Sequence, residues 1–458
     1  MFGRVSALGA QIRTTTTALP ARLSKDSRSA LSRRAGRIRL FPAVALALLA
    51  GLGVAFVAYG FLRWITPVDT AKAAAEIDVT RVALTVVAGV GGVVALVIAY
   101  RRQRDLEQSR FVERFGAAAA QLGATDVAVR IAGVYAMAGV ADESDGLRRQ
   151  QCIDVLCGYL RLPYSPDLGG NHQSKLVLKH HRATADGTRA DDQERHLEYR
   201  HNDREVRATI VRVIADHLRP TAEYSWSTSD FDFRTAYLEN VDFSRAKFLG
   251  SARFGEATFS GAVTSFADAI FSGTASFDGA TFSNTASFDG ATFSGSASFV
   301  FVVFSGTALF YRATFSSDVS FLNATFSTGN FDGAIFSGIA VFSHATFAST
   351  ASFDGATFSN DVFFTDATFA SSASFDSAIF SGTTMFVHVT FASSASFSGV
   401  TFSGSALFDV ATFSGTTVFV DPKQWGPPAP RFDWDQDISQ KPANIEPQNW
   451  PPSVVAAS

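Results

Sequence analysis

The sequence contains very little cysteine. Cys152 and Cys157 are the only two cysteines in 458 residues, which is too few for a disulfide framework. Their spacing is not that of a Cys-x-x-Cys redox motif, and no further cysteine or spaced histidine pair completes a zinc site. We therefore expect both cysteines to be reduced residues of a hydrophobic core.

Recognisable catalytic motifs are also missing. The sequence has no glycine-rich phosphate loop, no His-Glu-x-x-His helix and no Gly-x-Ser-x-Gly turn. Most of its histidines lie in one polar segment and share no helix face: His172, His180, His181, His196 and His201. The sequence thus predicts a protein that is not an enzyme, with no catalytic residue, cofactor or metal.

Two apolar runs stand out near the N-terminus. Leu40–Leu62 has 23 residues without a charge and Val82–Tyr100 has 19, enough for two helices that cross a hydrocarbon core of about 30 Å. The alternative for the second run is a buried, glycine-rich core helix. Glycines in both runs would allow close helix contact, within one hairpin or in a homodimer.

Basic residues flank these runs asymmetrically. Residues 1–39 carry nine Arg or Lys and one acid, and three arginines follow the second run at 101–104. Positive charge stays on the cytoplasmic side of a membrane. We therefore predict a basic cytoplasmic tail at 1–39, a transmembrane hairpin at 40–100 with helices at 40–62 and 82–100, and a multi-pass protein of the inner (plasma) membrane with both termini cytoplasmic. The tail could also attract anionic lipid or nucleic acid.

Residues 101–220 are expected to form a small α-helical cytoplasmic segment. Apolar residues recur at helical spacing in three groups: Val127, Ile131, Val134 and Met137; Ile153, Leu156, Cys157 and Leu160; Val206, Ile210, Val213 and Ile214. Residues 165–204 are polar and have no apolar period, so we predict a mobile insertion there.

Phenylalanine is the most unusual component, with 44 residues. From Leu238 to Phe419 a large apolar residue recurs at 34 positions, in steps that mostly alternate between five and six, and alanine stands two residues earlier in 24 of them. Residues two apart in an extended chain point to the same side, so Ala and Phe should face inward together. Each unit is then a short strand plus a corner, and the units must stack to bury anything.

The units ATFSG and ASFDG resemble the pentapeptide-repeat family. The resemblance implies a mainly β protein at 221–420, a right-handed quadrilateral β-helix with four units per coil and stacked Phe. The alternating steps sum to 22 residues per coil, which predicts an extra residue at two opposite corners. The steps Phe259–Phe266, of seven, and Phe326–Phe331, of five, are predicted to be a corner insertion and a corner deletion that leave the stacking in phase.

A wider resemblance covers residues 40–420. The stretches RFGAAAAQLG, RIAGVYAMAGVA, QCIDVLCGYLRLPY, EVRATIVRVIADHL and SWSTSDFDF are similar to those of a membrane-anchored pentapeptide-repeat group in actinobacteria. That group implies an architecture and no activity.

Acidic side chains are the one charge signal of the repeat. Residues 255–420 contain eleven acids and one base, Arg312. A 22-residue period places Asp332, Asp354 and Asp376 in one column, with Asp289 below them. Stacked like charges cost stability, so the column is a candidate site for a basic partner or a cation. The alternative is a solvated face with Asp-Gly corners.

Two function classes follow. The first is a membrane-anchored, non-enzymatic binding or scaffolding protein with an unidentified protein partner. The second, by analogy of fold, is an acidic DNA mimic that regulates a DNA-binding enzyme such as gyrase. Direct nucleic-acid binding is not expected of so acidic a repeat.

The segment 421–458 is a Pro- and Trp-rich tail. It holds eight of the fourteen prolines and three of the five tryptophans. Proline cannot extend a β-ladder, so no further coil is expected. We predict that Trp425 and Trp434 pack on the last coil and cap it, with the chain loose beyond Pro442; the alternative is a wholly disordered tail.

Overall fold

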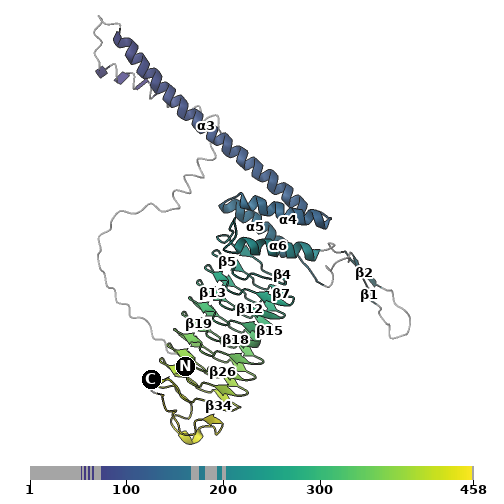
Figure 1. Cartoon of the computed structure of the whole chain (residues 1–458), viewed down its shortest axis with the longest axis vertical. Helices are drawn as coiled ribbons and strands as arrows, with labels where there is room; N and C mark the ends of the chain where they lie inside the picture. Colours follow the sequence, from purple (N-terminus) through teal and green to yellow (C-terminus); the bar gives the residue numbers. More distant parts are fainter. Residues whose placement is uncertain are drawn as a thin grey trace, which may run out of the picture. The chain divides into compact units, whose positions relative to one another are not determined.

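The computed structural model describes residues 74–166, 175–180, 193–198 and 203–455, with seven further positions between 53 and 65. The chain divides into two units, Met1–Arg110 and Phe111–Ser458, and helix α3 (Ala74–Leu122) begins in the first and ends in the second. The second unit contains the short helices and the repeat (Figure 1).

The structure does not support the predicted membrane hairpin. No helix among the described residues is both long and apolar enough to cross a membrane. The first predicted span, 40–62, lies mostly outside the described residues, and so do several side chains of the second, 82–100.

Three short helices precede the repeat: α4 (Val127–Asp142), α5 (Gly146–Leu160) and α6 (Asp203–Leu218). Helix α4 begins at Asp126, whose carboxylate accepts hydrogen bonds from the amides of Ala128 (2.7 Å) and Val129 (3.3 Å), as expected of an N-cap. The predicted apolar faces of α5 and α6 are buried, as are Val134 and Met137 of α4. These faces form a common core, which confirms the predicted helices and their buried sides.

The polar insertion contains secondary structure that the sequence analysis missed. Strands β1 (Lys175–His180) and β2 (Gln193–Glu198) pair antiparallel. Backbone hydrogen bonds can hold such a hairpin without apolar periodicity, so the sequence pattern gave no sign of it, and the predicted mobility of the insertion stays a prediction.

The repeat is a β-helix of about nine coils, built from parallel strand pairs. We number its faces in chain order. Face 1 contains β3 (Phe231–Asp232), β6 (Ala252–Arg253), β10 (Ala275–Ser276), β14 (Ala297–Ser298), β17 (Val319–Ser320), β20 (Ala340–Val341), β24 (Val362–Phe363), β28 (Thr384–Met385) and β32 (Ala406–Leu407). Face 2 contains β4 (Tyr237–Glu239), β7 (Thr258–Ser260), β11 (Thr281–Phe282), β21 (Thr346–Phe347), β25 (Thr368–Phe369), β29 (Thr390–Phe391) and β33 (Thr412–Phe413).

Face 3 contains β8 (Val263–Ser265), β12 (Thr285–Ser287), β22 (Ala351–Ser352), β26 (Ala373–Ser374), β30 (Ala395–Ser396), β34 (Thr417–Val418) and β36 (Ile445–Glu446). Two longer strands, β15 (Val303–Leu309) and β18 (Thr325–Asn330), pass from face 2 to face 3. Face 4 contains β5 (Lys247–Phe248), β9 (Ile270–Phe271), β13 (Thr292–Phe293), β16 (Thr314–Phe315), β19 (Ile335–Phe336), β23 (Thr357–Phe358), β27 (Ile379–Phe380), β31 (Thr401–Phe402) and β35 (Gln424–Trp425).

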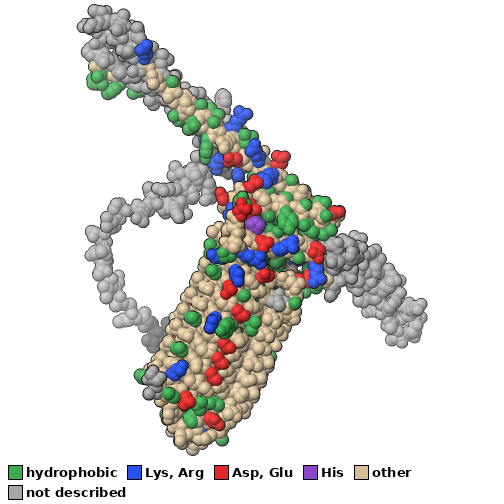
Figure 2. All heavy atoms as spheres, viewed as in Figure 1, with side chains coloured by type: hydrophobic (Ala, Val, Ile, Leu, Met, Phe, Trp, Pro, Cys, Tyr) green, Lys and Arg blue, Asp and Glu red, His purple; other side chains and the backbone are tan. Residues whose placement is uncertain are grey.

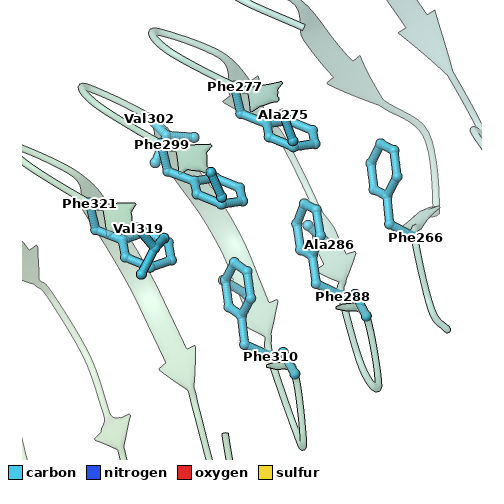
Figure 3. Packing of buried hydrophobic residues seen from close by; sticks show 14 of the residues in the cluster. Phe266, Ala275, Phe277, Ala286, Phe288, Phe299, Val302, Phe310, Val319 and Phe321 are labelled. Carbon is cyan, nitrogen blue, oxygen red and sulfur yellow. The ribbon is translucent and has the colours of Figure 1, made fainter. Parts of the chain in front are cut away.

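Phenylalanine rings fill the interior in four columns. Phe277 lies parallel to Phe254 below it and Phe299 above it, with ring centroids 4.8 Å apart in both pairs. Across the interior it meets Phe288 of the opposite face edge to face, at 5.5 Å. Figure 3 shows both arrangements, with the small Ala275 and Ala286 beside the rings. Stacked and T-shaped contacts are the two favourable geometries for aromatic rings.

The alternating step reflects two kinds of corner. At the five-residue corners a turn closes the chain: the amide of Ala280 donates to the carbonyl of Phe277 (3.0 Å), and Gly279 between them has φ +66°. The six-residue corners hold the extra residue. Gly295 lies at one of the six-residue corners. A Cβ at this position would lie only 2.5 Å from the carbonyl oxygen of Gly273 one coil below, so the corner requires glycine.

Both irregular steps keep the columns in phase, as predicted. The deletion lies within β18, which continues from face 2 to face 3 as one unbroken strand. Phe326 and Phe331 still stack on Phe347 (4.7 Å) and Phe353 (4.8 Å). At the insertion Gly261 takes φ +95°, while Phe259 and Phe266 still stack on the next coil.

The stacked columns begin one strand before Leu238, the first periodic position counted in the sequence, and within the predicted bounds of 221–420. Phe233 already stacks on Phe254, at 5.0 Å. Helices α5 and α6 contact the strands of this first coil, and Arg161 forms an ion pair with Asp232. This end of the β-helix is therefore covered by the helices.

The C-terminal tail covers the other end and corrects part of the prediction. Trp425 and Trp434 pack on the last coil, as expected, but the tail also pairs as a further, irregular coil: Thr401 with Gln424, Leu407 with Arg431 and Thr417 with Ile445. The chain beyond Pro442 is not loose, since Ile445 is fully buried. The prolines lie between the pairing segments, so each segment keeps its amide donors.

Candidate binding faces

The four aspartates that were predicted to form one column lie together at the corner that follows face 3. The amide of Gly333 donates to the carbonyl of Asp354, and that of Gly355 to the carbonyl of Asp376, each at 2.8 Å. Asp332, Asp354 and Asp376 therefore stand on consecutive coils, with Asp289 two coils below Asp332 and Tyr311 between them. Figure 2 shows a file of acidic side chains along the repeat.

These carboxylates are used within the fold. Oδ1 of Asp332 accepts the amide of Asp354 (3.1 Å), and Oδ1 of Asp354 accepts the amide of Asp376 (3.0 Å). The hydroxyls of Ser352 and Ser374 donate to the same two oxygens. Bonds to a charged acceptor are among the stronger ones in proteins, so the ladder explains the aspartates without any ligand.

The column continues this pattern at both ends. Asp376 accepts the amide of Ser398 (2.8 Å) and the hydroxyl of Ser396 (2.5 Å), and Asp289 accepts the amide of Tyr311 (3.0 Å). In the described part of the chain, no group of three or more His, Cys, Asp or Glu is placed to hold a metal ion.

Face 1 carries a feature that the sequence analysis missed. On each strand the residue before the core Phe points outward; it is Asp232 and Arg253 in the first two coils and Ser276, Ser298 and Ser320 in the next three. In the next four coils the same position holds large apolar residues, which the strand register places directly above one another: Val341, Phe363, Met385 and Leu407. We call these four residues the face-1 stripe.

The stripe interrupts a surface that is otherwise rich in serine and threonine. Its four side chains are partly exposed, whereas the residues on either side of each are buried. On the opposite face 3 the equivalent position holds Ser352, Ser374 and Ser396. A contiguous apolar file on such a surface is typical of an interaction site. Its sequence signal is a large apolar residue before the core Phe, repeated every 22 residues from 341 to 407.

A row of polar side chains borders the stripe. At the corner after face 1, His344, Asp366 and His388 follow one another on three coils. Oδ1 of Asp366 lies 3.5 Å from Nδ1 of His388, and its Oδ2 lies 3.9 Å from Nε2 of His344; all three side chains are 40–55% exposed. Asp361 lies on the other side of the stripe, where it accepts the amide of Thr383 (2.8 Å).

A polar cavity of about 530 Å³ lies between α6 and the first coil. Four arginines and four acids line it, and most of these charges are paired: Arg204 with Glu239 (2.9 Å), and Arg219 with Asp216 (2.7 Å) and Asp242 (3.0 Å). The Arg204–Glu239 and Arg219–Asp242 pairs join the end of the helical segment to the first coil.

Buried polar groups in the helical core also have structural partners. Arg130 forms an ion pair with Asp203 (2.7 Å), which also accepts the hydroxyl of Tyr159 (2.5 Å). Burial raises the pKa of the Cys152 thiol to about 11 and that of Cys157 to about 12. Both thiols are free and are protonated at neutral pH, which fits their role as core residues.

Comparison with known proteins bears on the repeat alone. Residues 243–292, 288–335, 331–379 and 353–401 match the family model described as pentapeptide repeats (9 copies). No curated protein and no solved structure matches the chain significantly.

Proposed function

We propose that this chain, whose residues 243–401 belong to the pentapeptide-repeat family, is a non-enzymatic binding or scaffolding protein that holds a protein partner on the face-1 stripe. The observation that carries the proposal is the replacement of serine by Val341, Phe363, Met385 and Leu407 on four consecutive coils. The fold does not require large apolar side chains at this outward position, because serine occupies it in the three coils below.

The size of the stripe limits the affinity that it can provide. Full burial of a large apolar side chain contributes about 1.5–3 kcal/mol, and these four are already partly buried. Association itself costs on the order of 4–15 kcal/mol. The partner must therefore also contact the polar rows beside the stripe, and we expect a reversible complex.

The DNA-mimic alternative has weaker support. Duplex DNA presents one charge per about 1.7 Å of axis, whereas the aspartate column presents one per coil, or about 4.8 Å. One oxygen of each column carboxylate also accepts an amide of the next coil. The net charge of residues 255–420, eleven acids minus one base, remains the observation in favour of this alternative.

Attachment to the plasma membrane by residues 40–100, with the repeat cytoplasmic, is a second part of the proposal. It rests on the uncharged runs and on the basic residues that flank them. A reporter that is active only outside the membrane, fused after Ser458, should be silent, and cell fractionation should place the chain in the membrane pellet.

Proximity labelling of the full chain in cells tests the binding role. The test variant is Phe363→Ser with Met385→Ser, which installs the residue found in the lower coils. The control is Thr292→Ser with Thr357→Ser, at outward positions of face 4. We expect the test variant alone to lose a defined set of labelled proteins. Identical labelling by both variants, including labelling of a second, differently tagged copy of the chain, would refute the proposal, and gyrase subunits retained in both would favour DNA mimicry.

A further inference from the structure

We infer that the occupant of the face-1 stripe is a second copy of this chain, bound face to face with its helix axis antiparallel. The inference rests on the proposed function and identifies the partner of the same surface. It follows from three features of the repeat: its closed ends, the order of residues along the stripe, and the charges on both sides of the stripe.

Both ends of the β-helix are largely covered. Helices α5 and α6 cover the first coil, and the tail pairs with the last coil through Gln424, Arg431 and Ile445. Exposed strand edges are the usual route by which β-proteins add further chains. With most of these edges paired, the side faces are the main surfaces of the described repeat through which two copies can associate, and face 1 carries an apolar file on four consecutive coils.

The stripe is complementary to itself about a two-fold axis. An axis parallel to the strands, between the coils of Phe363 and Met385, places Phe363 opposite Met385 of the second copy. It also places Val341 opposite Leu407 of the second copy. Each contact then occurs twice, as in the isologous interfaces of most homodimers, and the aromatic–thioether pair at the centre is favourable.

The neighbouring charges select the antiparallel arrangement. The same axis places Asp366 opposite His388 of the second copy, and Asp361 opposite Thr383. A parallel arrangement would instead bring Asp361 of one copy toward Asp366 of the other, on each side of the stripe. Like charges brought together in this way disfavour the wrong pairing.

The overlap is small, and it predicts a weak dimer. Six coils, from Ser320 to Arg431, can face each other across the axis. At about 4.8 Å per coil and about 3.3 Å per residue along the strand, the contact covers roughly 400 Å² per copy. Stable interfaces bury about 800 Å² per copy, so the dimer should form reversibly and depend on concentration.

Cysteine cross-linking of the full chain in cells tests the geometry. Two differently tagged copies are co-expressed, one with Val341→Cys and the other with Leu407→Cys, and treated with a short bismaleimide. The native cysteines are buried and provide the unreactive background. We expect a product that carries both tags, at least tenfold more than when both copies carry Val341→Cys, because those positions are three coils apart across the axis.

A charge exchange provides the second measurement. His388→Asp should reduce the mixed product at least fivefold, because it faces Asp366 of the other copy, and adding Asp366→His should restore it. Absence of an inter-copy product, dominance of the Val341–Val341 product, or cross-linking only to a different protein would overturn the inference. If cross-linking fails while Phe363→Ser with Met385→Ser still changes the labelled neighbours, the stripe binds another protein and the proposed function survives.

Discussion

Removal of one ring from an interior column is the most direct test of the packing. Phe293 is fully buried; its ring lies 4.8 Å from that of Phe271, 4.9 Å from that of Phe315 and 5.9 Å from that of Phe299. Phe293→Ala removes these contacts and leaves a cavity that the rigid backbone ladder cannot close. We expect a cost of about 3–5 kcal/mol, felt mainly by the adjacent coils because each coil contacts only its neighbours.

Hydrogen exchange of the full chain, read by mass spectrometry, measures this cost locally. Amides near the change, such as that of Ser316, which donates to the carbonyl of Phe293 (2.8 Å), should exchange about 10²- to 10⁴-fold faster, since 1.36 kcal/mol corresponds to a factor of ten. Ser294→Ala is the matched control, because Ser294 is exposed and should change stability by less than about 0.5 kcal/mol. Equal sensitivity at 293 and 294 would refute the inward assignment of the rings.

Three further outcomes are expected. Deletion of 421–458 uncovers Phe419 and the unpaired edges of β31 and β34, so sedimentation should show self-association that persists with Phe363→Ser; a deletion variant that behaves like the parent chain would contradict the capping role. Hydrogen bonds from Arg234, with the nearby Arg161, lower the pKa of Asp232 to about 2, so its contribution to stability is complete above about pH 4 and is lost as the pH falls toward 2; Asp232→Asn should flatten acid unfolding in that window, and an unchanged acid profile would argue against these bonds. Cys152 and Cys157 should resist maleimide at pH 8 until the chain unfolds, whereas fast labelling of the native protein would show that the helical core is open.

The periodic part of the molecule was predictable from the sequence. The Phe spacing predicted the inward-facing units, and together with the four units per coil implied by the family resemblance it predicted the four columns, the 22-residue coil and both corner irregularities, because one geometric constraint acts on every unit and the units repeat it 34 times. The same period placed Asp332, Asp354 and Asp376 in one column. Helical apolar spacing in the same way predicted the buried faces of α5 and α6.

The tertiary structure was needed where a feature depends on the neighbouring coil. The sequence could not show that each aspartate of the column accepts an amide of the next coil, because the donor lies 22 residues away and is a backbone group. It also concealed the closing coil of the tail, whose pairing segments are only one or two residues long and are separated by prolines. The face-1 stripe is an intermediate case: its residues are visible in the sequence, but they become a surface only when the register stacks Val341, Phe363, Met385 and Leu407.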